Sequence, residues 1–290
     1  MPEWFIEFPS SIKLNIKDAI DSFVDYLVVS WDPFFDALTR VLRGLLDGIG
    51  TVVNIIPWWL LIAAIFLVTW RSSRKLGQAV LYSVLLFCIG AMGLWAHMNV
   101  TLTVIIASVI ISILFGFPIG ILVASSKRLN TVTRPILDTM QTMPSFVYLI
   151  PAVMLLGLGN VPAVIATTIY AMPPIIRLTN HGIRQVDEEV VEAAKSFGST
   201  KWQTLVKAQI PQALPTIMTG VNQTIMMAIA MVVTCSMIGA TGLGQEVLIS
   251  INRLETGRGF SAGISIVIIA IVIDRLTQGI FKKGEDLNEQ

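Results

Sequence analysis

Long runs of apolar residues, separated by short polar segments, dominate the pattern along this chain. A run of about 20 apolar residues is long enough to cross the hydrocarbon core of a membrane as a helix. The pattern predicts about seven spans, at residues 51–70, 77–97, 101–125, 144–158, 161–180, 212–238 and 261–281. The run at 144–158 is the shortest and is rich in proline and glycine. The sequence therefore predicts an all-α, polytopic membrane protein.

The first 50 residues follow a different pattern, in which apolar and charged side chains occupy opposite faces of two predicted helices. The apolar face of the first helix consists of Ile12, Ile16, Ile20, Phe23 and Leu27. The second helix begins at Asp32-Pro33, and its apolar face consists of Phe34, Leu38, Val41, Leu42, Leu45 and Ile49. Neither segment is apolar enough to cross a membrane. We expect both to lie in the membrane interface or to pack around the spans.

The composition also indicates a membrane protein. Hydrophobic residues make up 54% of the 290 residues and charged residues only 13%, against about 25% charged residues in a typical soluble domain. The mean hydropathy of +0.75 excludes a disordered chain. The 20 Lys and Arg residues nearly balance the 19 Asp and Glu residues, so the chain lacks the basic excess that nucleic-acid binding requires. We expect lipid, and not nucleic acid, around this protein.

Lysine and arginine gather in alternate loops, after the first, third and fifth predicted spans and in the C-terminal tail. Positive charge marks the cytoplasmic side of a membrane protein. The N-terminus is therefore predicted outside and residues 281–290 in the cytoplasm. The last outer loop is an exception, because it holds Arg253 and Arg258, but Glu246 and Glu255 share that loop.

The chain has few residues that could perform chemistry inside the membrane. Cys88, Cys235, His97 and His181 are scattered, so we expect no metal site. No glycine-rich phosphate-binding motif is present, and no catalytic constellation is recognisable. The spans are almost free of charge. Asp274 and Arg275, in the last span, are expected to have a helix–helix or interfacial role. We predict no catalytic activity and no bound cofactor, so the driving force comes from another chain or the protein is a passive pore.

The loop after the fifth span has a recognisable local pattern. Asp187 can cap a short helix that continues with Glu192-Ala193-Ala194, and Gly198 can end it in the left-handed conformation. Thr200 and Gln203 then have the spacing of a capping box that begins a second helix. The pattern predicts a helix, a glycine hinge and a helix on the cytoplasmic face.

These residues resemble the coupling loop of permease subunits in binding-protein-dependent ABC importers. The family pattern is E-A-A, three residues, G, nine residues, I-x-L-P, and it is matched here except that Ala208 and Ile210 stand at the Ile and Leu positions. The resemblance covers residues 97–280, with the loop at 184–211, and leaves two extra segments at 51–96 outside it. Residues 215–224, 236–239, 242–245 and 273–278 are similar to the glycine betaine/proline branch.

The resemblance implies a type I importer permease core that imports a compatible solute: glycine betaine, proline, carnitine or choline, for osmoprotection. Two permease copies would each receive one ATPase subunit, which binds ATP and Mg²⁺, and an extracellular binding protein would dock on the loop at 239–260. The residues implied in coupling are Asp187, Glu192, Ala193, Ala194, Gly198 and Pro211. The candidates for lining the translocation pathway are Asn222, Gln223, Met226, Met227, Thr234 and Met237. A methionine or amino-acid importer, a passive channel, and a membrane enzyme or scaffold are the alternatives.

Overall fold

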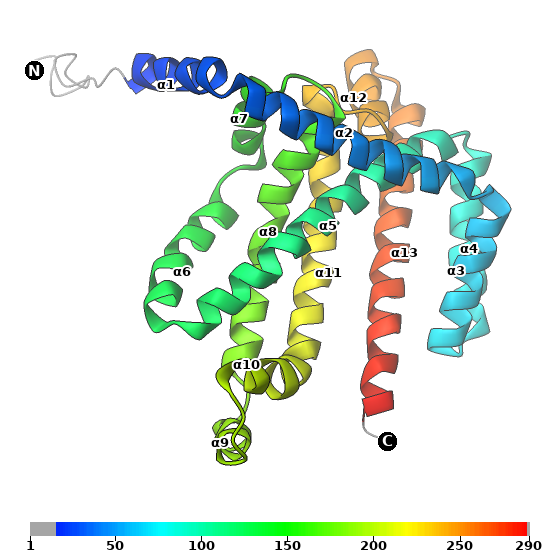
Figure 1. The fold of residues 1–290 in the computed structure, drawn as a ribbon. Coiled ribbons are helices and arrows are strands. Elements are labelled where there is room, and N and C mark those ends of the chain that lie inside the picture. Colours follow the sequence, from blue (N-terminus) through cyan, green and yellow to red (C-terminus); the bar gives the residue numbers. More distant parts are fainter. Residues whose placement is uncertain (1–15, 289–290) are drawn as a thin grey trace, which may run out of the picture.

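α-Helices make up nearly all of residues 16–288, which are the residues that the computed structural model describes, and none of these residues lies in a β-strand (Figure 1). The predicted all-α class is confirmed. The helices are α1 (Ile16–Ser30), α2 (Asp32–Ile55), α3 (Trp58–Ser73), α4 (Leu76–Ala91), α5 (Trp95–Ser125), α6 (Lys127–Thr142), α7 (Ser145–Leu156), α8 (Asn160–Arg184), α9 (Glu188–Ser196), α10 (Lys201–Thr204), α11 (Ile210–Cys235), α12 (Leu243–Arg253) and α13 (Thr256–Asn288). A π-helical segment, η3 (Leu205–Gln209), leads into α11, and a 3₁₀ turn, η4 (Ser236–Ile238), follows it.

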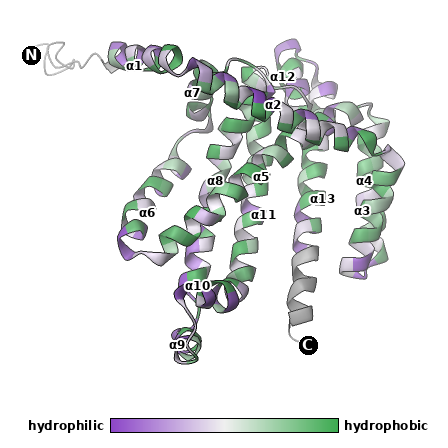
Figure 2. Ribbon diagram, in the orientation of Figure 1, coloured by the Kyte–Doolittle hydropathy of each residue, from purple (hydrophilic) through white to green (hydrophobic). Residues whose placement is uncertain are grey.

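The long helices run between two ends of the molecule. One end carries α9 and α10, and the other carries α12 together with α1, α2 and α7 (Figure 1). We call them the α9 end and the α12 end. Figure 2 shows hydrophobic residues along α3, α4, α5 and α11, whereas hydrophilic residues gather at α9 and α10. This distribution is what a membrane-spanning bundle requires, because lipid surrounds the middle of the helices and water their ends.

Four stretches are long and apolar enough to cross a membrane: α5, α8, residues 201–238 and the part of α13 up to Gly279. Two bent helix pairs, α2 with α3 at 87° and α6 with α7 at 95°, raise the number to six if each pair is one span, and α4 is a shorter apolar helix. These findings support a polytopic protein. The count of seven spans stays a prediction.

Two of the predicted span boundaries are wrong. The predicted span 51–70 begins too early, because α2 continues to Ile55 and the chain turns at Pro57 before α3 begins. Proline disfavours helical geometry in the residue before it, and Ile56 is extended, with φ −71° and ψ 114°. The predicted span 77–97 ends too late, because α4 stops at Ala91 and Gly93 adopts φ +74°. The hydropathy pattern does not register either turn, since the residues around them remain apolar.

Helices α5 and α8 pack closely against each other. Small residues recur on α5 at every fourth position, Ser108, Ser112, Gly116 and Gly120, which is the pattern that lets membrane helices approach closely. The Ser112 hydroxyl donates to the carbonyl oxygen of Thr168 on α8 at 3.2 Å. These residues set the distance between the two helices at the centre of the protein.

The amphipathic helices α1 and α2 differ in how they meet this bundle. Leu42 and Leu46 on α2 are buried in the cluster that joins α5, α8 and α11. On α1 the large side chains of Ile20 and Phe23 are 55% and 61% exposed. α2 therefore packs across the bundle at the α12 end, as the amphipathic pattern predicted. The predicted apolar position Ile12 lies outside the described residues.

Candidate functional site

The loop predicted to couple this chain to a partner folds as a short helix with defined ends. The Asp187 carboxylate accepts a hydrogen bond from the backbone N–H of Glu189 at 2.9 Å and caps α9. Gly198 has φ +81° and follows the end of the helix. Both features confirm the local prediction, and most residues other than glycine and asparagine would be strained at position 198.

The second arm of the loop is tied to the first. The Thr200 hydroxyl accepts from the N–H of Gln203 at 3.3 Å, and the Gln203 side chain accepts from the N–H of Thr200 at 2.8 Å. This is the predicted capping box. The Ser199 hydroxyl also donates to the carbonyl oxygen of Ala194 at 2.6 Å. The hydrogen bonds join α9 and α10 into one local unit.

Helix α9 and its neighbours present an exposed, partly apolar surface. No residue of α9 is buried in this chain. The Phe197 side chain is 93% exposed, and that of Trp202 is 68% exposed. Large aromatic side chains that are exposed on a surface are typical of a protein–protein interface. The surface at the α9 end is therefore suited to contact with another protein.

A cavity of about 320 Å³ lies between α9 and the ends of α5 and α8. Its lining includes Arg184, Glu188, Glu192 and Lys195. The cavity separates α9 from the ends of α5 and α8, and the helices that α9 contacts are α10 and η3. The coupling residues thus belong to a unit that extends from the bundle and is joined to it at two places, the end of α8 and the start of α11.

Of the predicted coupling residues, Asp187 through Gly198 lie together in and around α9, whereas Pro211 lies beyond η3 in the first turn of α11. Pro211 has no N–H to donate to a carbonyl one turn earlier. The π-helical hydrogen bonding of η3 directly precedes it, and the N–H of Ile210 donates to the carbonyl oxygen of Leu205. Segments of this kind interrupt regular helices, frequently at functional sites.

The predicted pathway residues on α11 and η4 divide between two environments. Gln223, Met226 and Met237 are exposed and Thr234 is half-buried, and their spacing puts them on one face. Asn222 instead forms hydrogen bonds with α13, and Met227 packs against the main hydrophobic cluster. The structure therefore brings four of the six residues together on one open face.

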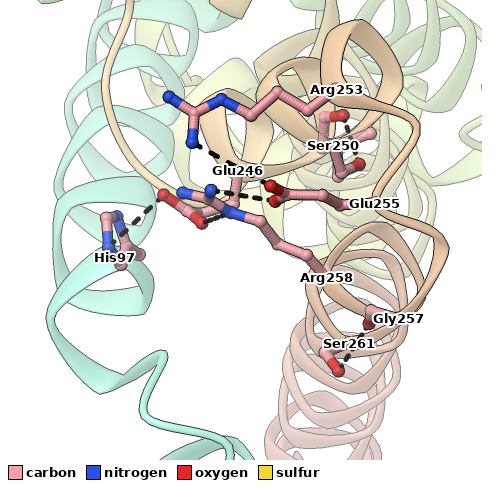
Figure 3. A network of polar contacts seen from close by, with 9 residues as sticks. His97, Glu246, Ser250, Arg253, Glu255, Gly257, Arg258 and Ser261 are labelled. Carbon is pink, nitrogen blue, oxygen red and sulfur yellow. Dashed lines mark hydrogen bonds and ion pairs between the residues drawn. The ribbon is translucent and has the colours of Figure 1, made fainter.

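The loop predicted at 239–260 contains a helix, α12, and a buried charge that the sequence pattern did not reveal. The Glu246 side chain accepts a hydrogen bond from Nε of Arg258 at 2.7 Å, and His97 on α5 approaches its other oxygen at 3.6 Å (Figure 3). Arg258 also donates to Glu255 at 3.2 Å. The bond from Arg258 holds the pKa of Glu246 below its usual value. These contacts connect α5, α12 and α13.

The turn between α12 and α13 places apolar side chains in the open. Leu254 is 88% exposed and has φ +57°, a conformation that is uncommon for residues other than glycine. Ile251, three residues earlier in the last turn of α12, is 63% exposed. Glu255, the residue that follows Leu254, forms an ion pair with Arg258 at 3.2 Å, and this pair stabilises the turn. This turn is a second exposed apolar surface, at the opposite end from α9.

Comparison with known proteins shows the family to which this chain belongs. Residues 116–283 match the family described as "Binding-protein-dependent transport system inner membrane component". The chain is 47% identical to the glycine betaine/carnitine transport permease protein of Listeria monocytogenes over 280 residues, which is 96% of this chain and 99% of that protein. It is 45% identical to the glycine betaine transport system permease protein of Bacillus subtilis, covering 92% of this chain and 95% of that one.

A solved structure of a methionine ABC transporter in an inward-facing conformation has the same fold, with a TM-score of 0.60 and 20% identity over 66% of this chain and 95% of that one. The predicted family resemblance is confirmed by the family match and by relatives that are similar along nearly their whole length. The chain is a polytopic membrane protein of the binding-protein-dependent transport system inner membrane component family, the family of ABC importer permeases.

Proposed function

We propose that this chain forms the translocation pathway of an ATP-driven importer for compatible solutes: glycine betaine, carnitine, choline or proline. The relatives whose names specify glycine betaine align with nearly the whole chain. Similarity of this extent supports the same solute class.

The observation that carries this proposal is the exposed coupling unit at the α9 end. An ATPase subunit would cover Phe197 and the small surface of Ala193, which are open in this chain alone. ATP and Mg²⁺ would bind to that subunit, and this chain would contribute no catalytic group. Two permease copies would bind two ATPase subunits, so closure of the ATPase pair would move both α9 helices together.

The open face of α11 would line the pathway where two permease copies meet. Gln223, Met226, Thr234 and Met237 would be accessible to solute from that face, whereas Asn222 and Met227 would support the helix from behind. The α9 end would face the cytoplasm and α1 would lie on the outside. The lysines and arginines near α9, such as Lys201 and Lys207, support this orientation.

An extracellular binding protein would deliver the solute at the α12 end. The apolar side chains of Ile251 and Leu254 are accessible there, on a turn that ion pairs stabilise. Recognition of the quaternary ammonium group would belong to the binding protein, because aromatic cages suit that chemistry, and the permease would need only an open path.

ATP-dependent uptake by the complete reconstituted complex tests this function. The chain, its ATPase and its binding protein are placed in proteoliposomes, and uptake of labelled glycine betaine, carnitine, choline, proline and methionine is measured with and without ATP. We expect uptake of a quaternary amine that requires both ATP and the binding protein. Uptake of methionine alone would contradict the solute class, and uptake without ATP would indicate a passive channel.

A further inference from the structure

Helix α8, which leads into the coupling unit, carries three polar side chains on one face. Arg177, Asn180 and Arg184 are spaced by three and four residues, so they lie one above another along the helix. We call these three residues the α8 ladder. Each contacts α6 or the turn between α5 and α6.

The contacts of the ladder are short and specific. Nη2 of Arg177 lies 2.6 Å from the carboxylate of Asp138 on α6. The Asn180 amide donates to the side-chain oxygen of Asn130 on α6 at 2.8 Å, and both residues are only 8% exposed. A buried amide pair of this kind is costly to separate, because each group would lose its partner without gaining water.

Arg184 completes the ladder at the end nearest the coupling unit. Its Nη2 donates to two backbone carbonyl oxygens at the turn before α6, those of Val123 at 3.2 Å and Ser126 at 3.0 Å. Its Nε donates to the Asn180 side chain at 2.9 Å. One planar guanidinium group therefore holds the last turn of α8, the end of α5 and the start of α6 in a fixed arrangement.

Apolar packing alone gives α6 little attachment to the bundle. Leu129, Val132 and Ile136 on α6 are 48%, 62% and 53% exposed, whereas Leu137 is buried. In Figure 1, α6 diverges from α8 on the side away from α11. Polar bonds from the ladder thus supply much of the connection between α6 and the helix that precedes α9.

The ladder also adjoins the coupling unit directly. Arg184 stands three residues before the cap residue Asp187, and its side chain lines the cavity beneath α9. A displacement of α9 that turns the end of α8 would therefore change the position of Arg184 relative to the carbonyl groups of Val123 and Ser126.

We propose that the α8 ladder transmits movement of α9 to α6 and α7, and that Arg184 is its main positioning residue. This inference rests on the proposed function, because it assigns the route by which ATP binding on the partner reaches the membrane helices. Coupling between distant sites requires groups that are physically linked and that change arrangement together. The ladder links α9 with the bent pair of α6 and α7, in addition to the direct connection of η3 with α11.

Arg184→Lys provides the first test, because lysine keeps the positive charge and loses the planar group that reaches two carbonyl oxygens. ATP hydrolysis and solute uptake are measured together in the complete complex. We expect the amount of solute moved per ATP hydrolysed to fall about tenfold, with hydrolysis retained. Arg128→Lys is the matched control. Arg128 is exposed on α6 and forms no hydrogen bond or ion pair with the described part of the chain, so the ratio of solute to ATP should stay unchanged.

A second variant, Asn130→Ala, keeps the proposal testable if the Arg184 variant does not assemble. It breaks the same connection from α6 and changes no residue of α8 or of the coupling unit. Spin labels at Ser196 on α9 and Val132 on α6, both exposed, report whether the two helices move together. We expect ATP binding to change the distance between the labels in the unaltered ladder and to change it less in Asn130→Ala. A purely structural role would lower the unfolding temperature and leave both the uptake ratio and the distance change intact.

The two proposals fail in different ways. If the unaltered complex takes up no quaternary amine, the proposed solute class is wrong, and the distance measurement still decides whether the ladder transmits movement. If the unaltered complex transports and both Arg184→Lys and Asn130→Ala keep a normal ratio of solute to ATP, the ladder inference is wrong.

Discussion

The side-chain amide of Asn222 on α11 donates a hydrogen bond of 2.9 Å to the carboxylate of Asp274 on α13. Thr277 donates back to the Asn222 oxygen at 2.8 Å, and Gln278 donates to the same carboxylate at 2.7 Å. Polar side chains between membrane helices stabilise their association, because lipid cannot satisfy them. The bonds fit the helix–helix role expected for Asp274, and they give Asn222 a partner away from the proposed pathway.

Asn222→Ala should therefore weaken the attachment of α13 to α11. We expect a loss of about 0.6–2 kcal/mol, the range for hydrogen bonds between membrane helices, measured as a lower thermal unfolding temperature in detergent. Gln223→Ala is the matched control, since Gln223 is the exposed neighbour on the same helix. An unchanged unfolding temperature together with an altered KM for solute would show that Asn222 lines the pathway instead.

Gly120→Ala should separate α5 from α8. A Cβ atom at this position would lie 2.6 Å from Cβ of Thr179 and 3.0 Å from the carbonyl oxygen of Ile176, and backbone atoms cannot turn aside. Overpacking of this kind costs about 1–3 kcal/mol, and we expect a lower unfolding temperature. Gly77→Ala is the control: a Cβ there meets nothing within 4 Å, so greater helix propensity should leave stability equal or improved. Equal effects of the two variants would contradict the close contact.

The features that the sequence predicted best depend on neighbours along the chain. Asp187 caps α9 through a residue two positions later, and Thr200 pairs with Gln203 three positions later. Such bonds need only local geometry, so residue type and spacing are enough to predict them. The amphipathic face of α2 was predictable for the same reason, since one helix contains the whole pattern.

The features that the sequence did not predict join segments far apart in the chain. His97 and Arg258 meet at Glu246, and Asn180 meets Asn130. Nothing in the spacing of these residues indicates that they are close, because tertiary packing decides which helices are neighbours. The pattern did contain one usable signal for packing, the small residues repeated every four positions on α5, which mark its contact with α8.

The Glu246 ion pair should make the α12 end sensitive to acid. Arg258 lowers the pKa of this carboxyl group in the folded protein. A carboxyl group with a lowered folded pKa stabilises the fold above its unfolded pKa, and that stability is lost as the pH falls through the folded pKa. We expect the unfolding temperature of the unaltered chain to fall as the pH decreases below about 4.5. Glu246→Gln should show less of this dependence.

The control for that measurement is Glu188→Gln, because Glu188 lies at the other end of the molecule on exposed α9. This variant should keep the pH dependence of the unaltered chain. If Glu246→Gln and Glu188→Gln have identical pH profiles, the buried carboxylate does not contribute to acid sensitivity.

The effect of a substitution at Gly198 should depend on two things: whether the new residue can adopt a positive φ, and how large its side chain is. Its φ of +81° favours glycine or asparagine, and a Cβ atom would meet nothing within 4 Å in this chain. Gly198→Asn should therefore fold and transport normally, whereas Gly198→Trp places a large side chain on the surface that the ATPase would cover. We expect Gly198→Trp to lose most ATP-dependent uptake while the chain still folds, as measured by uptake in proteoliposomes and by the unfolding temperature. Normal uptake by Gly198→Trp would contradict the assignment of this loop as the site where the ATPase attaches.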